Sequence, residues 1–171
     1  SIHCVIASAD TVNVVQQQEQ KSFDVMYPER KRLSPFKGTF PTNGVKPCDN
    51  GDIDVITKVH KNGAVFESHS LNDLKAVKKK YESVFYKGYA PYLVFVNHTP
   101  SNGVFNTHVC EANSSLTWSN FVFAFECNSL EEANQLAEWL KSKEIKEKNL
   151  ELLDGKYTIS KAIISQLPWF E

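Results

Sequence analysis

The chain has 171 residues, of which 42% are hydrophobic and 23% are charged, and its formal net charge is -1. This size and balance are typical of a globular protein that buries a real core. No apolar run approaches about 18 residues, which excludes a transmembrane helix, and no basic and apolar signal peptide opens the chain. Because the chain begins at Ser1, we expect it to be processed or cut from a larger protein, and we expect a cytoplasmic location.

The first part of the chain, residues 1–51, predicts short strands followed by a long irregular segment. The runs IHCVIAS, TVNVVQ and FDVMYP favour strands, because they are rich in β-branched residues. Residues 28–51 contain four prolines and three glycines, which indicate turns and not a helix. Loops of this length are usually functional or mobile. No role is assigned to residues 1–51.

Residues 53–69 predict a β-hairpin with Asn62-Gly63 in its turn. The strand before the turn is expected to alternate, with one face formed by Ile53, Val55, Thr57 and Val59. Ser70 is then expected to cap a helix, with Asp73 as its capping partner. The apolar face of this helix is expected to contain Leu71, Leu74, Val77 and Tyr81.

The second half of the chain predicts three strands and two helical segments. The strands are PYLVFVN, VFNTHVCEA and TWSNFVFAFEC, and the turn TPSNG joins the first two. Ser129 and Glu132 form a capping box before a helix that extends, with a break, toward Leu153. The tail TISKAIISQLPWFE predicts a short helix followed by an aromatic latch. The fold class is therefore α+β, a mixed and mainly antiparallel sheet with about three helices packed on it.

The sequence lacks the motifs of several common kinds of active site. There is no glycine-rich phosphate loop, no G-x-S-x-G elbow and no HExxH zinc motif. The four cysteines contain no C-x-x-C pair, and we expect them to be reduced thiols. His98, His108 and Cys110 could meet if their strands pair, which leaves a His/Cys metal site open as an alternative.

Two further groups of charged residues are candidates for function. Asp52 and Asp54 lie two residues apart at a strand start, and with Glu67 and Lys58 they could form a metal-dependent nuclease site. Residues 28–89 contain twelve Lys or Arg against seven Asp or Glu. Such a basic half is a weak indication of a polyanion partner, and a solvated surface explains the charges equally well.

The region 52–171 resembles the C-terminal target-recognition region of adenine-specific DNA methyltransferases from restriction-modification systems and phages. The resemblance rests on SLEEA at the start of the second helix and on the closing ISKAIISQLPW. It implies that residues 52–171 form a target-recognition domain. It also implies that the LPWF tail completes that domain and has no catalytic role.

The catalytic motifs of that family are absent from this chain. Every proline is isolated, so the Asn/Asp-Pro-Pro-aromatic motif that holds the flipped adenine is missing, and so is the glycine-containing cofactor loop. The resemblance therefore implies a non-catalytic piece or relative of such an enzyme, with no cofactor of its own. S-adenosylmethionine would be bound only by a catalytic domain attached in the parent protein.

The leading interpretation is a non-catalytic domain that recognises double-stranded DNA. Lysine and arginine would contact phosphates, and amides and hydroxyls near the turn NHTPSNG would contact base edges. The phosphate candidates are Arg30, Lys31, Arg32, Lys58, Lys61, Lys75, Lys78, Lys79 and Lys80. The base-edge candidates are Asn97, Thr99, Ser101, Asn102, Asn106 and Asn120.

Two alternatives to DNA recognition remain open. The chain could be a small viral or phage protein that binds or inhibits a protein partner, because its aromatic content and near-neutral charge suit a protein interface. The metal-dependent nuclease is the weaker alternative. A catalytic domain in cis is a further possible partner, and no membrane contact is expected.

Overall fold

The computed structural model describes residues 31–170, and residues 32–170 form one compact unit. The strand predictions before residue 31 lie outside the described residues. The strands are β1 (Phe36–Lys37), β2 (Ile53–His60), β3 (Gly63–His69), β4 (Tyr92–Asn97), β5 (Thr107–Glu111), β6 (Thr117–Trp118) and β7 (Val122–Cys127). The helices are α2 (Leu71–Val77), the 3-10 helix η2 (Tyr81–Val84), α3 (Leu130–Trp139), α4 (Lys143–Leu153) and α5 (Lys161–Ile164).

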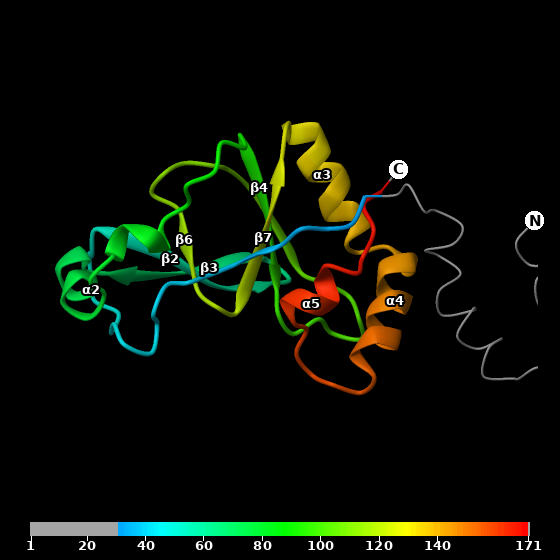
Figure 1. Ribbon diagram of the computed structural model, residues 1–171, viewed down its shortest axis with the longest axis horizontal. Coiled ribbons are helices and arrows are strands. Elements are labelled where there is room, and N and C mark those ends of the chain that lie inside the picture. Colours follow the sequence, from blue (N-terminus) through cyan, green and yellow to red (C-terminus); the bar gives the residue numbers. More distant parts are fainter. Residues whose placement is uncertain (1–30, 171) are drawn as a thin grey trace, which may run out of the picture. The chain divides into compact units, whose positions relative to one another are not determined.

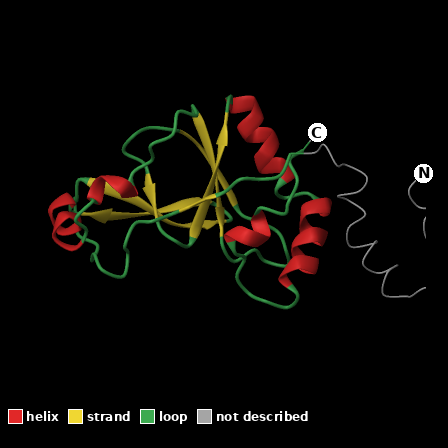
Figure 2. Cartoon of the chain, in the orientation of Figure 1, coloured by secondary structure: helices red, strands yellow, loops and turns green. Residues whose placement is uncertain are grey.

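The predicted α+β class is confirmed, with the described strands divided between two sheets. One sheet has the order β1-β7-β4-β5, and its strand pairs are antiparallel. The other has the order β3-β2-β6, in which β2 and β6 run parallel. The single strand expected over TWSNFVFAFEC is thus two strands, because β6 leaves for the smaller sheet before β7 begins. Helices α3, α4 and α5 gather at one end of the unit, and α2 lies at the other (Figures 1 and 2).

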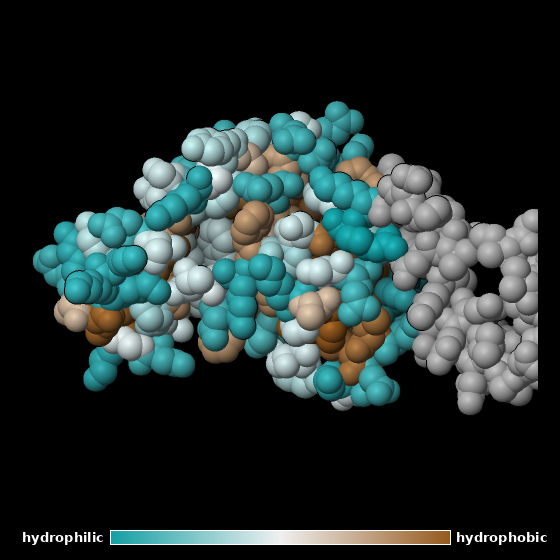
Figure 3. Space-filling view, in the orientation of Figure 1, coloured by the Kyte–Doolittle hydropathy of each residue, from teal (hydrophilic) through white to brown (hydrophobic). Residues whose placement is uncertain are grey.

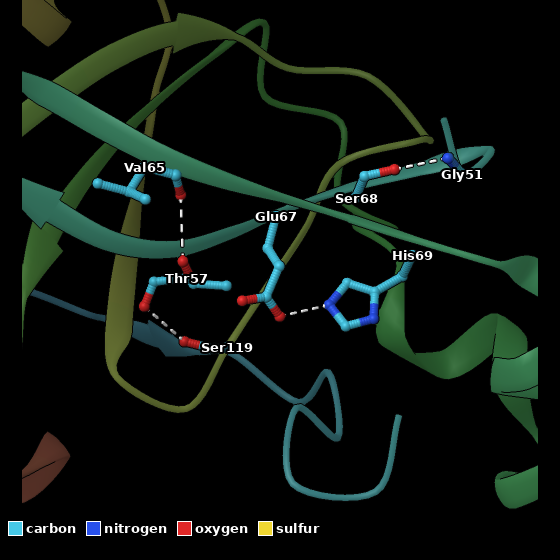
Figure 4. A network of polar contacts seen from close by, with 7 residues as sticks. All are labelled: Gly51, Thr57, Val65, Glu67, Ser68, His69 and Ser119. Atoms are coloured by element: carbon cyan, nitrogen blue, oxygen red, sulfur yellow. Dashed lines mark hydrogen bonds and ion pairs between the residues drawn. The ribbon is translucent and has the colours of Figure 1, made fainter. Parts of the chain in front are cut away.

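The hairpin of β2 and β3 contains a β-bulge that simple alternation did not predict. Ile56 pairs with Phe66 and Lys58 pairs with Val65, so Thr57 is an extra residue. The Thr57 hydroxyl donates to the Val65 carbonyl (3.4 Å), and the Thr57 carbonyl accepts from the Ser119 hydroxyl (3.0 Å), as Figure 4 shows. Ile56, which precedes the bulge, is fully buried although alternation placed it on the outer face, because it packs in a core cluster with Phe95 and Trp118.

The two serines predicted to cap helices, Ser70 and Ser129, do so in the structure. The Ser70 hydroxyl accepts from the Asp73 amide (3.4 Å), and the Ser129 hydroxyl accepts from the Glu132 amide (3.0 Å). The Glu132 carboxylate accepts from the Asn128 amide (3.0 Å), one residue before the N-cap, so the reciprocal bond of the predicted capping box is displaced by one residue. Helix α2 is shorter than its apolar pattern indicated: it ends at Val77, which is exposed.

The C-terminal tail packs on the main core. Ile159, Ile164 and Leu167 are buried there, in contact with apolar side chains of α3 and α4. Trp169 packs against the same cluster but keeps part of its surface exposed, so the expected latch is present and incompletely buried. The Trp139 indole donates to the Pro168 carbonyl (2.7 Å).

Residues 32–51 contribute to the same compact unit as the chain that follows them. Leu33 is buried, and its amide donates to the Leu167 carbonyl (2.7 Å), which places the start of the described chain beside the tail (Figure 1). Phe40 and Val45 are buried against α2 and β2, and β1 forms an edge of the larger sheet. The proline- and glycine-rich segment therefore has a structural role.

The surface of the described unit combines hydrophilic and apolar side chains. Apolar side chains appear in small separate groups on a mainly hydrophilic face (Figure 3). Between residues 31 and 170, the helices are too short or too polar for any of them to cross a bilayer.

Candidate nucleic-acid interface

A hollow of about 430 Å³ gathers several of the predicted DNA-contacting residues, and we call it the basic hollow. It lies between the end of β2 and the segment that follows β4. Its lining consists of Lys58, Val59, His60, Asn97, His98, Thr99, Asn106 and Phe121. Within the described chain, the only formally charged side chain of this lining is that of Lys58, and no carboxylate is present. The hollow therefore favours an anionic or polar ligand over a cation.

An aromatic pair forms one side of the basic hollow. The rings of His98 and Phe121 lie 5.0 Å apart and are inclined by 37°. Burial lowers the pKa of His98 below its usual value; a hydrogen bond with the Phe121 backbone opposes this, and the nearby charge of Lys37 adds to it. The neutral imidazole therefore dominates at pH 7, and the pair presents a flat, uncharged surface beside Lys58.

Two of the predicted asparagines hold the loop of the basic hollow together. The Asn97 amide group donates to the Thr99 carbonyl (2.8 Å), and its oxygen accepts from the Asn106 backbone amide (2.9 Å). Asn97 is almost completely buried. Its side chain is therefore committed to the loop. The Asn106 side-chain amide donates to the Val59 carbonyl (3.5 Å), which leaves the Asn106 side-chain oxygen and Thr99 better placed to contact a ligand.

The loop between β4 and β5 is fixed on helix α4. Ser101 and Val104 exchange backbone hydrogen bonds across a tight turn, in which Asn102 and Gly103 both have positive φ (50° and 79°). The buried Asn149 of α4 donates to the Gly103 carbonyl (2.8 Å). A Cβ at Gly103 would lie 2.6 Å from the Lys146 carbonyl, so the turn approaches α4 as closely as glycine allows. This contact pre-organises the loop that lines the basic hollow.

The remaining DNA-contact candidates lie outside the basic hollow. Lys61 is exposed in the hairpin turn next to His60, and Ser101 and Asn102 are exposed in the tight turn. Asn120 lines a separate shallow hollow with residues 39–44. Arg32 lies beside Pro168 of the tail, Lys31 is exposed, and Arg30 is outside the described residues.

The four lysines between residues 75 and 80 are divided between α2 and the turn after it. Lys75 lies on α2, with its ammonium group 5.0 Å from the centre of the Tyr81 ring. Lys78 caps the C-terminus of α2 through its backbone, and Lys79 and Lys80 are exposed in the following turn. The structure does not bring these lysines into the basic hollow.

The carboxylates proposed for a nuclease do not form a metal site. An oxygen of Asp52 accepts from the Leu71 amide (2.7 Å), and Glu67 pairs with the buried His69 (2.6 Å), as Figure 4 shows for the second pair. Lys58 lies in the basic hollow, beyond the bulge. Over residues 31–170, no three His, Cys, Asp or Glu side chains gather as metal ligands.

His98, His108 and Cys110 do not form a metal site either. The strands pair as supposed, but His98 packs on Phe121, whereas His108 lies near Phe66 and Phe95. Burial raises the pKa of the Cys110 thiol to about 11, which disfavours the thiolate that a metal requires. These three side chains therefore do not gather as metal ligands in the described part of the chain.

No local pattern in the sequence groups His60, His98 and Phe121, which together line the basic hollow. Only the pairing of β2 with its neighbours brings His60 toward a loop nearly forty residues later. An aromatic and a histidine next to polar turns were the available signals, and they are too common to be specific.

No family model and no curated protein matches the chain.

Proposed function

We propose that the chain is a non-catalytic DNA-recognition domain that binds double-stranded DNA at the basic hollow. The observation that carries the proposal is the convergence of Lys58, Thr99 and Asn106 with the His98–Phe121 pair in one hollow. These residues come from three separate segments, and they combine a cation, hydrogen-bonding groups and an aromatic surface. Such a combination suits contact with phosphates and with base edges.

The exposure of each side chain indicates whether it would contact phosphates or base edges. Lys58 and Lys61 are exposed and would neutralise phosphates, which is the main source of DNA affinity. Thr99 and Asn106 are half-buried on a braced loop, where a fixed geometry favours reading of base edges. Bracing lowers the ordering cost of binding, because the loop held by Asn149 is already in place.

The proposal retains the resemblance to adenine-specific DNA methyltransferases. The chain would correspond to their target-recognition region, and it would need no cofactor. S-adenosylmethionine would be held by a catalytic domain of a longer parent protein or by a partner subunit.

Salt dependence of DNA binding tests the proposal. Fluorescence anisotropy of a labelled DNA duplex would be measured over a range of salt concentrations for the unsubstituted chain and for the double variant Lys58→Ala/Lys61→Ala. We expect the double variant to bind more weakly to all sequences, with a salt slope flatter by roughly one unit for each phosphate that is no longer neutralised. Lys143→Ala/Lys156→Ala is the matched control, because both lysines are exposed on or after α4. An unchanged slope in the folded Lys58/Lys61 variant contradicts the assignment.

The lysines after α2 extend the same test. Lys78, Lys79 and Lys80 replaced together by Ala should weaken binding about equally for all sequences, because phosphate contacts carry no base information. If the salt slope stays unchanged, these three lysines are solvated surface, and the contact is confined to the basic hollow.

A protein partner is the second candidate function, and exposed apolar residues of β3 favour it. Val65 and Phe66 are 37% and 54% exposed on an edge strand of the smaller sheet. Exposed apolar edge strands commonly pair with other chains. Binding through such a surface would depend only weakly on salt, in contrast to DNA binding.

A further inference from the structure

A second hollow, of about 540 Å³, has the opposite character to the first, and we call it the acidic hollow. It lies between the start of β2, the segment containing η2, and the loop between β5 and β6. Its lining consists of Asp52, Ile53, Asp54, Phe66, Leu71, Tyr81, Phe85, Asn113, Ser114, Ser115 and Leu116. Its volume lies within the range of small-ligand sites, roughly 300–1,000 Å³.

Three aromatic rings from two segments line this hollow. Phe66 comes from β3, Tyr81 from η2, and Phe85 from the residue after η2. Phe66 is 54% exposed, so part of its ring is open to a ligand. Asp54 lies on the same face of the hairpin as Phe66, because Asp54 pairs with Ser68 and Ile56 pairs with Phe66.

The charge of the acidic hollow is uncompensated within its lining. Both titratable acids are exposed aspartates, and among the described residues no lysine, arginine or histidine lines the hollow. One oxygen of Asp52 is engaged by the Leu71 amide, which leaves the other oxygen and both oxygens of Asp54 for a ligand. Lys75 is not part of the lining, but its ammonium group lies 5.0 Å from the centre of the Tyr81 ring.

We propose that the acidic hollow binds an arginine side chain of a protein partner. Aromatic faces attract cations, and a guanidinium group also stacks on rings while its donors reach carboxylates in pairs. The position of Lys75 over Tyr81 is a cation–aromatic contact of this kind within the chain itself. Arginine fits better than lysine, because the hollow offers both flat rings and carboxylates. This assignment goes beyond DNA binding, since carboxylates repel phosphates, and it names the chemical group that a protein partner would present.

Titration of the isotope-labelled full chain with N-acetyl-arginine amide, followed by NMR, tests the proposal. We expect saturable shifts of the backbone amides that line the acidic hollow, with a dissociation constant on the order of millimolar for a single side chain. N-acetyl-lysine amide should bind more weakly, and N-acetyl-citrulline amide, which has the shape of arginine without its charge, should not shift these amides. Absence of lining shifts with arginine at tens of millimolar, or equal shifts with citrulline, overturns the proposal.

Variants assign the effect to named side chains. Asp54→Asn and Phe66→Leu should each weaken arginine binding about two- to fivefold, the range typical of exposed ion pairs and cation–aromatic contacts. Both positions are exposed, and leucine keeps the apolar volume without the ring. Glu144→Gln on α4 is the control, because it removes an exposed carboxylate elsewhere. Unchanged arginine binding in both variants overturns the proposal. DNA affinity at the basic hollow should be unaffected by either variant, so the two assignments fail independently.

Discussion

The C-terminal tail is expected to stabilise the fold and not to contact DNA, and substitutions at Leu167 and Trp169 measure this. Leu167 is fully buried, and its carbonyl accepts the Leu33 amide at 2.7 Å. Trp169 packs on the same core with part of its surface exposed. Leu→Ala in a core costs about 2–5 kcal/mol and Trp→Ala about 3–5 kcal/mol. Allowing for the exposed part of Trp169, we expect about 2–3 kcal/mol for Trp169→Ala and about 3–4 kcal/mol for Leu167→Ala.

The assay is thermal unfolding followed by circular dichroism, combined with DNA anisotropy well below the midpoint. For a unit of this size, Tm falls by about 3 °C per kcal/mol of destabilisation, which gives a fall of roughly 6–9 °C for Trp169→Ala and roughly 9–12 °C for Leu167→Ala. Tyr157→Ala is the control, because Tyr157 is 81% exposed. An unchanged Tm for Trp169→Ala, together with a loss of about 1–3 kcal/mol in DNA affinity, would refute the reasoning and identify a base-stacking residue.

Three further predictions concern other parts of the chain. Burial and the hydrogen bond to Glu126 raise the pKa of Tyr86 to about 12, so the folded state keeps this proton where the unfolded state loses it, and stability should fall as pH rises from 10 to 12. Tyr86→Phe should remove this alkaline loss in pH-dependent denaturant melts. Asn149→Ala should cost about 1–3 kcal/mol and speed hydrogen exchange at the Val104 amide, because the Gly103 carbonyl loses its buried donor. The isolated chain should neither bind S-adenosylmethionine nor methylate DNA, and micromolar binding in isothermal titration would contradict this.

Local signals in the sequence predicted the elements that depend on near neighbours. Ser70 and Ser129 each cap the helix that follows, since a capping hydroxyl and its amide lie three residues apart. Asn102-Gly103 forms the expected tight turn, because both positions require positive φ.

Features that depend on distant partners could not be predicted in this way. The separation of β6 from β7 depends on the parallel pairing of Val55 with Thr117, more than sixty residues away. The His98–Phe121 pair and the Asp52 contact with Leu71 likewise join residues that no local pattern connects. For this reason the residue types of the candidate sites were partly foreseen, but their grouping into two hollows was not.

The bulge at Thr57 explains how one short hairpin serves two hollows of opposite character. Successive residues of a strand point to opposite faces, so regular alternation would place Lys58 on the same face as Asp54 and Ile56. Because Thr57 is an extra residue, Lys58 instead pairs with Val65, whose side chain points away from the face of Phe66. Asp54 and Phe66 then line the acidic hollow, whereas Lys58 lines the basic hollow. Without the bulge, Lys58 would point to the face of Asp54 and Phe66, and the basic hollow would lose the one formally charged side chain of its lining. Thr57 is held in place by its bonds to Val65 and Ser119, so the face to which Lys58 points depends on a contact that lies in neither hollow.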